Sequence, residues 1–157
     1  MVVYPRGVDE IGWEKSFWKD VFRNAMHTGR TVDSMRLWDV MRAAALLRQE
    51  AGVDPGRILV AGRGVSAGLA LYAAFLDSQI QQVLLFDPPS SHTEGPIFLN
   101  VLRYTDLPEV AARMAPRKVN FYARIPSSYG SHPHYFRTMN LQMVLDGRYD
   151  HRFASGW

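Results

Sequence analysis

The chain has 157 residues and a mass of 17.8 kDa, so we expect one domain spanning residues 1–157. Hydrophobic residues make up 47% of the chain and charged residues 21%, which excludes an intrinsically disordered protein. No apolar run approaches the roughly 18 residues of a membrane span, and no secretory signal is visible, so we expect no membrane association and a cytoplasmic location by default. Since the chain has no cysteine, disulfides and thiolate metal sites are excluded.

The formal net charge is +3, from 18 basic and 15 acidic residues. The basic residues are dispersed from Arg6 to Arg152, which is typical of surface ion pairs and not of a surface that follows a phosphate backbone. We therefore expect no nucleic-acid partner. We also expect no cofactor and no metal.

Apolar residues follow helical spacing in some stretches and short uninterrupted runs in others. After the apolar start at 2–4, the chain is mixed and aromatic up to a turn signal at 27–29. The pattern then predicts a helix over about 33–47, and Asp33 or Ser34 can cap it. Further helices are predicted over 66–76 and near 107–115. Strands are predicted at 57–61, where the run is apolar enough for a buried strand, at 82–86 and at 118–123. This alternation predicts an α/β fold with a mostly parallel sheet of about four or five strands and helices on both faces. Ile58–Ala61 and Val83–Phe86 are expected as its central strands.

A literal G-x-S-x-G pattern, from Gly64 to Gly68, lies between the strand at 57–61 and the next helix. In a nucleophile elbow a serine sits on a sharp strand-to-helix turn, and the helix N-terminus helps to stabilise the developing oxyanion. The literal pattern makes Ser66 the nucleophile. Counting from the end of the strand gives another register, in which Gly62 ends the strand and Gly64 occupies the nucleophile position, so that the elbow is degenerate. A third interpretation is that Ser66 caps or lines the start of the helix.

Three stretches carry a family resemblance: Tyr4-Pro5-Arg6-Gly7, the run from Gly29 to Asp39, and Val53-Asp54-Pro55-Gly56-Arg57-Ile58 leading into the glycine turn. They resemble α/β-hydrolases of the acetyl xylan esterase and prolyl-oligopeptidase-like kind, and the likeness extends to about Pro126. The resemblance implies a reduced α/β-hydrolase-like domain that corresponds to the C-terminal half of the family's fold. It also implies serine-dependent hydrolysis of a small ester or an acylated carbohydrate, with the elbow and oxyanion contacts at Gly64, Ala67 and Gly68. The alternative is a catalytically inactive binding or interaction module of the same fold.

The other members of a catalytic triad follow from the same resemblance. The family places its histidine after the last strand, and here the apolar run at 141–145 is followed by His151, the expected general base. No carboxylate follows the strand at 118–123, so Asp87, at the end of the preceding strand, would orient the imidazole. A simpler interpretation of His151 is an exposed histidine in a turn, and a simpler interpretation of Asp87 is a residue of an Asp-Pro turn. His132 and His134 are alternative bases, but without a third ligand their spacing does not favour a metal site.

The same turn allows a different chemistry. Gly62, Gly64 and Gly68 follow a strand, and Asp87 closes the next one, which resembles a loose dinucleotide-binding turn. Its backbone N–H groups would then hold a pyrophosphate. The spacing of the later glycines departs from the usual motif, so nucleotide binding is the second alternative.

Two features near the start of the chain predict self-association. Residues 2–4 would leave a sheet edge with unpaired backbone groups. The segment 8–31 also carries more aromatic surface than a half-sheet can bury, from Trp13, Phe17, Trp18 and Phe22. We therefore expect a twofold homodimer, unless this aromatic segment folds over its own sheet edge.

Overall fold

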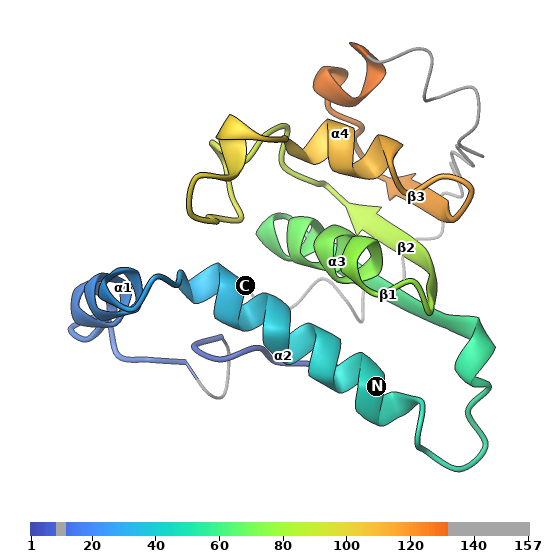
Figure 1. The fold of residues 1–157 in the computed structure, drawn as a ribbon, viewed down its shortest axis with the longest axis horizontal. Coiled ribbons are helices and arrows are strands. Elements are labelled where there is room, and N and C mark those ends of the chain that lie inside the picture. Colours follow the sequence, from blue (N-terminus) through green and yellow to red (C-terminus); the bar gives the residue numbers. More distant parts are fainter. Residues whose placement is uncertain (9–11, 132–157) are drawn as a thin grey trace.

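The computed structural model describes residues 1–8 and 12–131 (Figure 1). In chain order, the helices and strands are α1 (Trp18–His27), α2 (Val32–Leu47), β1 (Ile58–Arg63), α3 (Val65–Leu76), β2 (Ile80–Phe86), α4 (Leu107–Ala112) and β3 (Lys118–Tyr122). Short 3₁₀ turns lie at Pro55–Arg57, Val101–Arg103 and Ser127–Ser131. From β1 onward strands alternate with helices, which is the α/β arrangement that the hydrophobic pattern predicts.

The strands form a parallel sheet in the order β1-β2-β3. Val60, Val83 and Val119 lie side by side across it. The described residues thus contain three strands, fewer than the four or five that the sequence predicts, and the apolar run at 141–145 lies outside them. Of the two strands predicted to be central, β2 has a neighbour on each side, whereas β1 is an edge strand in the described part of the sheet.

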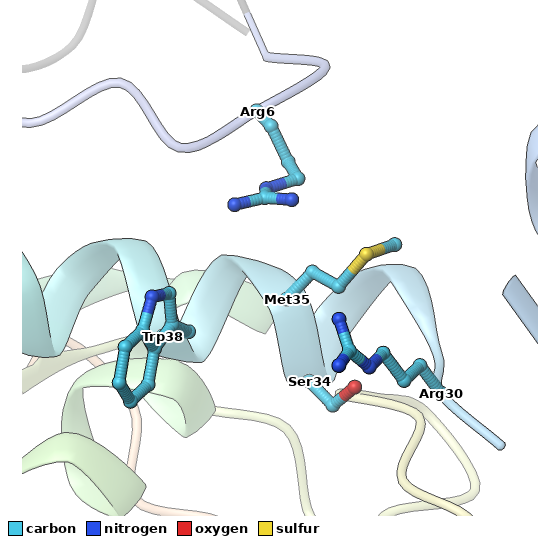
Figure 2. Close-up of a pocket in the computed structure, with 5 residues that line it drawn as sticks. All are labelled: Arg6, Arg30, Ser34, Met35 and Trp38. Atoms are coloured by element: carbon cyan, nitrogen blue, oxygen red, sulfur yellow. The ribbon is translucent and has the colours of Figure 1, made fainter. Parts of the chain in front are cut away.

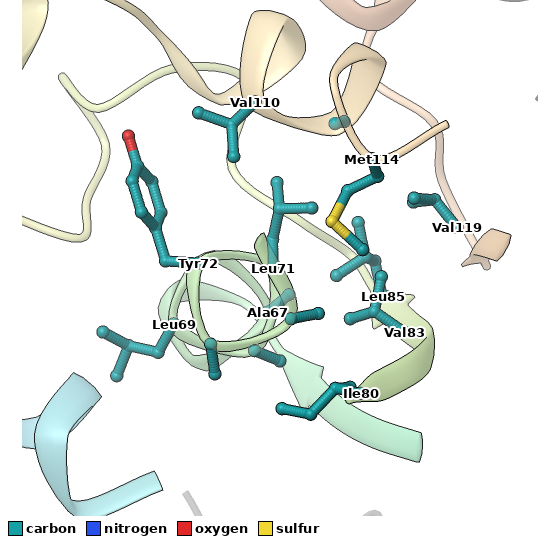
Figure 3. Close-up of a cluster of buried hydrophobic side chains, with 14 of the residues drawn as sticks. Ala67, Leu69, Leu71, Tyr72, Ile80, Val83, Leu85, Val110, Met114 and Val119 are labelled. Carbon is teal, nitrogen blue, oxygen red and sulfur yellow. The ribbon is translucent and has the colours of Figure 1, made fainter. Parts of the chain in front are cut away.

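The core is built around α3, which carries no charged residue. All residues of Ala67–Ala74 are buried, because α3 contacts β1 and β2 and also packs against α2 and α4. Figure 3 shows Ile80, Val83, Leu85 and Val119 of the sheet pointing toward this helix. A helix that is apolar on all sides must be covered on all sides, and this requirement explains the central place of α3.

The described helices all lie on the α3 side of the sheet, since α2 and α4 pack on α3 and α1 packs on α2 (Figure 1). The prediction of helices on both faces is therefore wrong for this part of the chain. The opposite side of the sheet, called the open face here, consists of Leu59, Ala61, Arg63, Gln82, Leu84, Phe86, Lys118, Asn120 and Tyr122. Apart from Asn120 these residues are exposed or half-buried. Leu59 is 47% exposed although the apolar run around it predicts a fully buried strand, because no described helix covers this face.

The N-terminal residues lie against α2 and form no strand. The Arg6 guanidinium donates two hydrogen bonds to the Asp39 carboxylate, at 2.8 and 2.5 Å, and the Arg6 backbone N–H donates a third at 3.1 Å. The sheet edge predicted at residues 2–4 is therefore wrong. In the described sheet the edge on this side is β1.

Three of the four aromatic residues at 13–22 pack on one another, and Trp18 also contacts α2, whereas Phe17 is 57% exposed. The ring centroids of Trp13 and Trp18 are 5.4 Å apart, and those of Trp18 and Phe22 are 5.3 Å apart. The Arg36 guanidinium of α2 lies 5.4 Å from the centroid of the Trp18 ring. These contacts place the described part of the segment on α2, so the alternative in which it folds over the sheet edge is not what the structure contains.

Helix α2 begins at a capping box formed by Thr31 and Ser34, not at the Asp33 or Ser34 cap that the sequence predicts. Thr31 Oγ1 accepts a hydrogen bond from the Ser34 N–H, and Ser34 Oγ accepts one from the Thr31 N–H, both at 3.0 Å. The Asp33 carboxylate instead accepts from the Ile97 N–H at 2.8 Å, and the Thr31 hydroxyl donates to the Ile97 carbonyl at 2.5 Å. These bonds fix the loop after β2 to the start of α2.

Candidate functional site

The connection between β1 and α3 is a sharp strand-to-helix turn with Gly64 at its apex. Gly64 has φ 56° and ψ −129°, a backbone conformation that residues with side chains rarely adopt. Its N–H donates to the Phe86 carbonyl of β2 at 2.9 Å, and its carbonyl accepts from the Ala67 N–H at 2.9 Å. A nucleophile elbow places its nucleophile on such a strained turn. At this apex the chain has no side chain.

The other two glycines of the turn are required for close packing. A Cβ on Gly62 would lie 2.2 Å from the Ser66 carbonyl oxygen, because β1 and the first turn of α3 cross closely at that point. A Cβ on Gly68 would lie 2.3 Å from Pro96 Cδ of the loop after β2. A Cβ on Gly64 would meet no atom within 4 Å. The geometry fits the register with Gly62 at the crossing and Gly64 at the apex, although β1 ends at Arg63, one residue beyond the predicted end at Gly62.

Ser66 is the second residue of α3 and is half-buried. Its carbonyl faces Gly62 at the crossing of strand and helix. The first turn of α3 has no side-chain cap, since its N-cap residue is Gly64. The Ser66 hydroxyl therefore belongs to the first turn of the helix, two residues beyond the apex.

Asp87 follows β2 and lies at the same edge of the sheet as the elbow. Its carboxylate pairs with the Arg63 guanidinium, with 3.1 Å between Oδ2 and Nη2, and both side chains are more than one third exposed. The Asp87 N–H donates to the Tyr122 carbonyl at 3.3 Å. The structure thus brings Asp87 next to the residue that precedes Gly64, and an exposed pair of this kind contributes little to stability.

Each of the three described strands is followed by a residue with positive φ: 56° at Gly64, 44° at Asp87 and 67° at Ala123. Backbone strain of this kind collects at functional sites in proteins. The position after β3, where the family resemblance implies the triad acid, holds Ala123 followed by Arg124 and therefore no carboxylate. Of the other predicted site residues, His132, His134 and His151 lie outside the described residues.

The structure also reveals a buried histidine, His92, to which the sequence gives no role. Its Nε2 lies 2.8 Å from the Tyr72 hydroxyl, and its Nδ1 lies 2.6 Å from the Pro96 carbonyl oxygen. Burial raises the pKa of Tyr72 to about 12. Both ring nitrogens are engaged, so His92 holds the loop after β2 against α3. The sequence carries no signal for this role, because the three residues meet only through the fold.

The nucleotide-binding alternative relies on the same glycines. Gly62 and Gly68 contact other parts of this chain, the carbonyl of Ser66 and the ring of Pro96. Asp87, which would bind the ribose, is paired with Arg63. Among residues 1–8 and 12–131, no group of three or more His, Asp or Glu side chains is placed to hold a metal ion.

Comparison with known proteins gives no matching family model, no similar curated protein and no similar solved structure. In the part of the chain that the structure describes, none of the helices has both the length and the hydropathy needed to cross a membrane.

Proposed function

We propose that this chain is a non-catalytic interaction module with an α/β-hydrolase-like strand-turn-helix at its centre. The observation that carries the proposal is the conformation of Gly64. The apex of the elbow has the strained backbone on which a nucleophile stands in a hydrolase, and here it carries a hydrogen atom in place of a side chain.

The surroundings of the apex support the same proposal. Asp87 is paired with Arg63, and no carboxylate follows β3 at Ala123 or Arg124. A catalytic triad needs a base that is oriented by an acid. Near the elbow, the carboxylate of Asp87 is paired with a cation, and the positions after β3 hold no carboxylate.

The surface suited to interaction is the edge of β1 together with the open face. β1 has a neighbour on one side only in the described sheet, so half of its backbone N–H and C=O groups point away from β2. Leu59 and Ala61 present exposed apolar side chains beside this edge, without a lysine or proline in the strand to block pairing. A second copy of the chain is the partner that fits, because twofold antiparallel pairing of β1 would satisfy both edges at once.

Light scattering tests this association. We expect a mass near twice 17.8 kDa for the wild-type chain and a shift toward monomer for Leu59→Lys. Leu46→Lys is the matched control, because Leu46 is 57% exposed on α2, away from the sheet, and its substitution leaves the mass unchanged. A wild-type mass near 17.8 kDa would refute self-association at β1.

The second candidate function is a serine esterase that acts on small acyl esters or acylated carbohydrates. The observation that favours it is the place of Ser66 in the first turn of α3, at the edge of the sheet that also holds Asp87. Ser66 Oγ would bond to the ester carbonyl carbon while His151 takes the hydroxyl proton and passes it to the departing alcohol, and water would then release the acid. The Gly68 N–H would face the oxyanion, whereas the Ala67 N–H, which the resemblance also implies as a contact, already donates to the Gly64 carbonyl at 2.9 Å.

Turnover of p-nitrophenyl acetate separates the two candidates. The non-catalytic proposal predicts equal background rates for the wild-type chain and for Ser66→Ala. A rate that Ser66→Ala abolishes, with the fold retained by circular dichroism, would establish the esterase and overturn the first proposal.

A further inference from the structure

A groove lies between the N-terminal segment and α2, away from the elbow. It has a volume of about 480 Å³ and is lined by Arg6, Arg30, Ser34, Met35 and Trp38. Figure 2 shows Arg6 reaching from the N-terminal segment toward α2, with Met35 and Trp38 on the helix and Arg30 on the chain just before it. A volume of this size lies within the range of small-molecule sites in proteins.

The charged residues that line the groove are both arginines. Arg6 is held rigidly, because its Nε and Nη2 and its backbone N–H are bonded to the Asp39 carboxylate, which raises the pKa of Arg6. Asp39 is occupied by these bonds, and the nearby Asp33 pairs with Arg36 at 3.1 Å. Arg30 is exposed and forms no ion pair with a described residue, while its backbone N–H is anchored to the Ala25 carbonyl at 3.0 Å. The positive charge that no described carboxylate neutralises is therefore that of Arg30, whereas the charge of Arg6 is balanced by Asp39.

The apolar wall of the groove is also exposed. Trp38 is 59% exposed, and it lies one helical turn beyond Ser34 and Met35, so the three residues share one side of α2. The Arg42 guanidinium lies 6.0 Å from the centroid of the Trp38 ring. An exposed indole in a groove that is also lined by arginines provides a flat surface for stacking in the same groove as donors for an anion.

We propose that this groove binds a small organic anion with a planar ring, whose phosphate or carboxylate group is held by Arg30 and whose ring lies against Trp38, while Arg6 lines the opposite side with its Nε and Nη2 bonded to Asp39. Guanidinium groups suit both anions, because their fork of N–H donors matches two oxygens at once. Met35 supplies an adaptable apolar side chain beside the indole. This ligand site is independent of the elbow and of the β1 edge.

Calorimetric titration of the full chain with four probes tests the proposal. Adenosine monophosphate and 2-naphthoate carry a ring with a phosphate or a carboxylate, whereas adenosine and 2-naphthamide are their uncharged counterparts. We expect at least one of the anions to bind with a Kd below about 1 mM, and the uncharged counterparts to bind at least about tenfold more weakly. Binding of only one anion identifies the preferred group and supports the site.

The variants locate the binding. Arg30→Ala and Trp38→Ala should each weaken binding by about tenfold or more, since neither side chain is part of the core. Arg103→Ala and Tyr104→Ala are the matched controls, an exposed arginine and a tyrosine that is 79% exposed after the loop, and they should leave the Kd unchanged. Absence of binding by both anions, equal binding of the uncharged probes, or equal losses in the control variants would overturn the proposal.

Discussion

Two glycines of the same turn should respond to alanine in opposite ways. A Cβ at Gly62 would lie 2.2 Å from the Ser66 carbonyl oxygen, 2.5 Å from the Ser66 carbonyl carbon and 2.8 Å from the Ala67 nitrogen. All three atoms are backbone, so β1 and α3 would have to separate, and we expect Gly62→Ala to lower the free energy of unfolding by about 3 kcal/mol or more. At Gly64 a Cβ meets nothing within 4 Å. The penalty there is the strain at φ 56°, about 1–3 kcal/mol.

Urea unfolding followed by far-ultraviolet circular dichroism measures both variants. Gly29→Ala serves as a further comparison, because Gly29 also has positive φ, at 70°, with nothing within 4 Å of its Cβ, and lies between α1 and α2. We expect Gly64→Ala to resemble Gly29→Ala and Gly62→Ala to be clearly less stable than either. If Gly62→Ala is as stable as Gly64→Ala, the close crossing of β1 and α3 is wrong, and with it the assignment of Gly64 to the apex.

Three further outcomes follow from buried polar groups. Arg117 Nη1 donates to three backbone carbonyls around the end of α3 and the start of β2, so Arg117→Met should lower the free energy of unfolding by about 2–3 kcal/mol, and an unchanged urea midpoint would contradict this. Burial raises the pKa of Tyr72 to about 12, above its ordinary value near 10. The contribution of Tyr72 to the free energy of unfolding is therefore complete below pH 10 and falls by about 1.4 kcal/mol per pH unit between pH 10 and 12. Tyr72→Phe should make the free energy of unfolding less dependent on pH in this range. Asn120 Oδ1 is buried without a described hydrogen-bond partner, so Asn120→Leu should raise the melting temperature, and a fall would show that the amide is satisfied.

The strands and the central helix follow from local hydrophobicity. The runs at 58–61, 83–86 and 118–122 are strands, and the apolar residues after the glycine turn form α3. The exposure of β1 cannot be predicted from its sequence, because an apolar run indicates that a strand tends to be buried but does not indicate which other elements pack against it. Leu59 is exposed because none of the helices in residues 1–8 and 12–131 lies on its side of the sheet, and the placement of helices depends on the tertiary fold.

The packing of the N-terminal segment on α2 is difficult to predict because it depends on contacts between residues distant in the sequence. The aromatic residues of α1 stabilise one another and α2 through Trp18, a contact between distant segments that periodicity cannot indicate. The sequence alone does not determine the cap of α2, because several residues near 31–34 can cap a helix. Thr31 is the cap because its backbone is extended and its side chain and that of Ser34 bond reciprocally.

At the elbow, the sequence offers two registers and the backbone favours one. The literal motif places a serine at Ser66, whereas the length of β1 places Gly64 at the apex. The G-x-S-x-G motif does not determine the residue at which the strand ends, and the register of the elbow depends on that residue. Gly64 at φ 56° and the close approach at Gly62 are the features that distinguish the registers.

The proposal that the elbow lacks a nucleophile is tested most directly by treating the wild-type chain with a fluorophosphonate and measuring the mass of the intact protein. A degenerate elbow predicts no covalent adduct on the wild-type chain. A serine esterase of known activity, treated in parallel, is the positive control, because the reagent reacts with a serine that a base activates. A stoichiometric adduct on the wild-type chain that maps to Ser66 and disappears in Ser66→Ala would contradict the account.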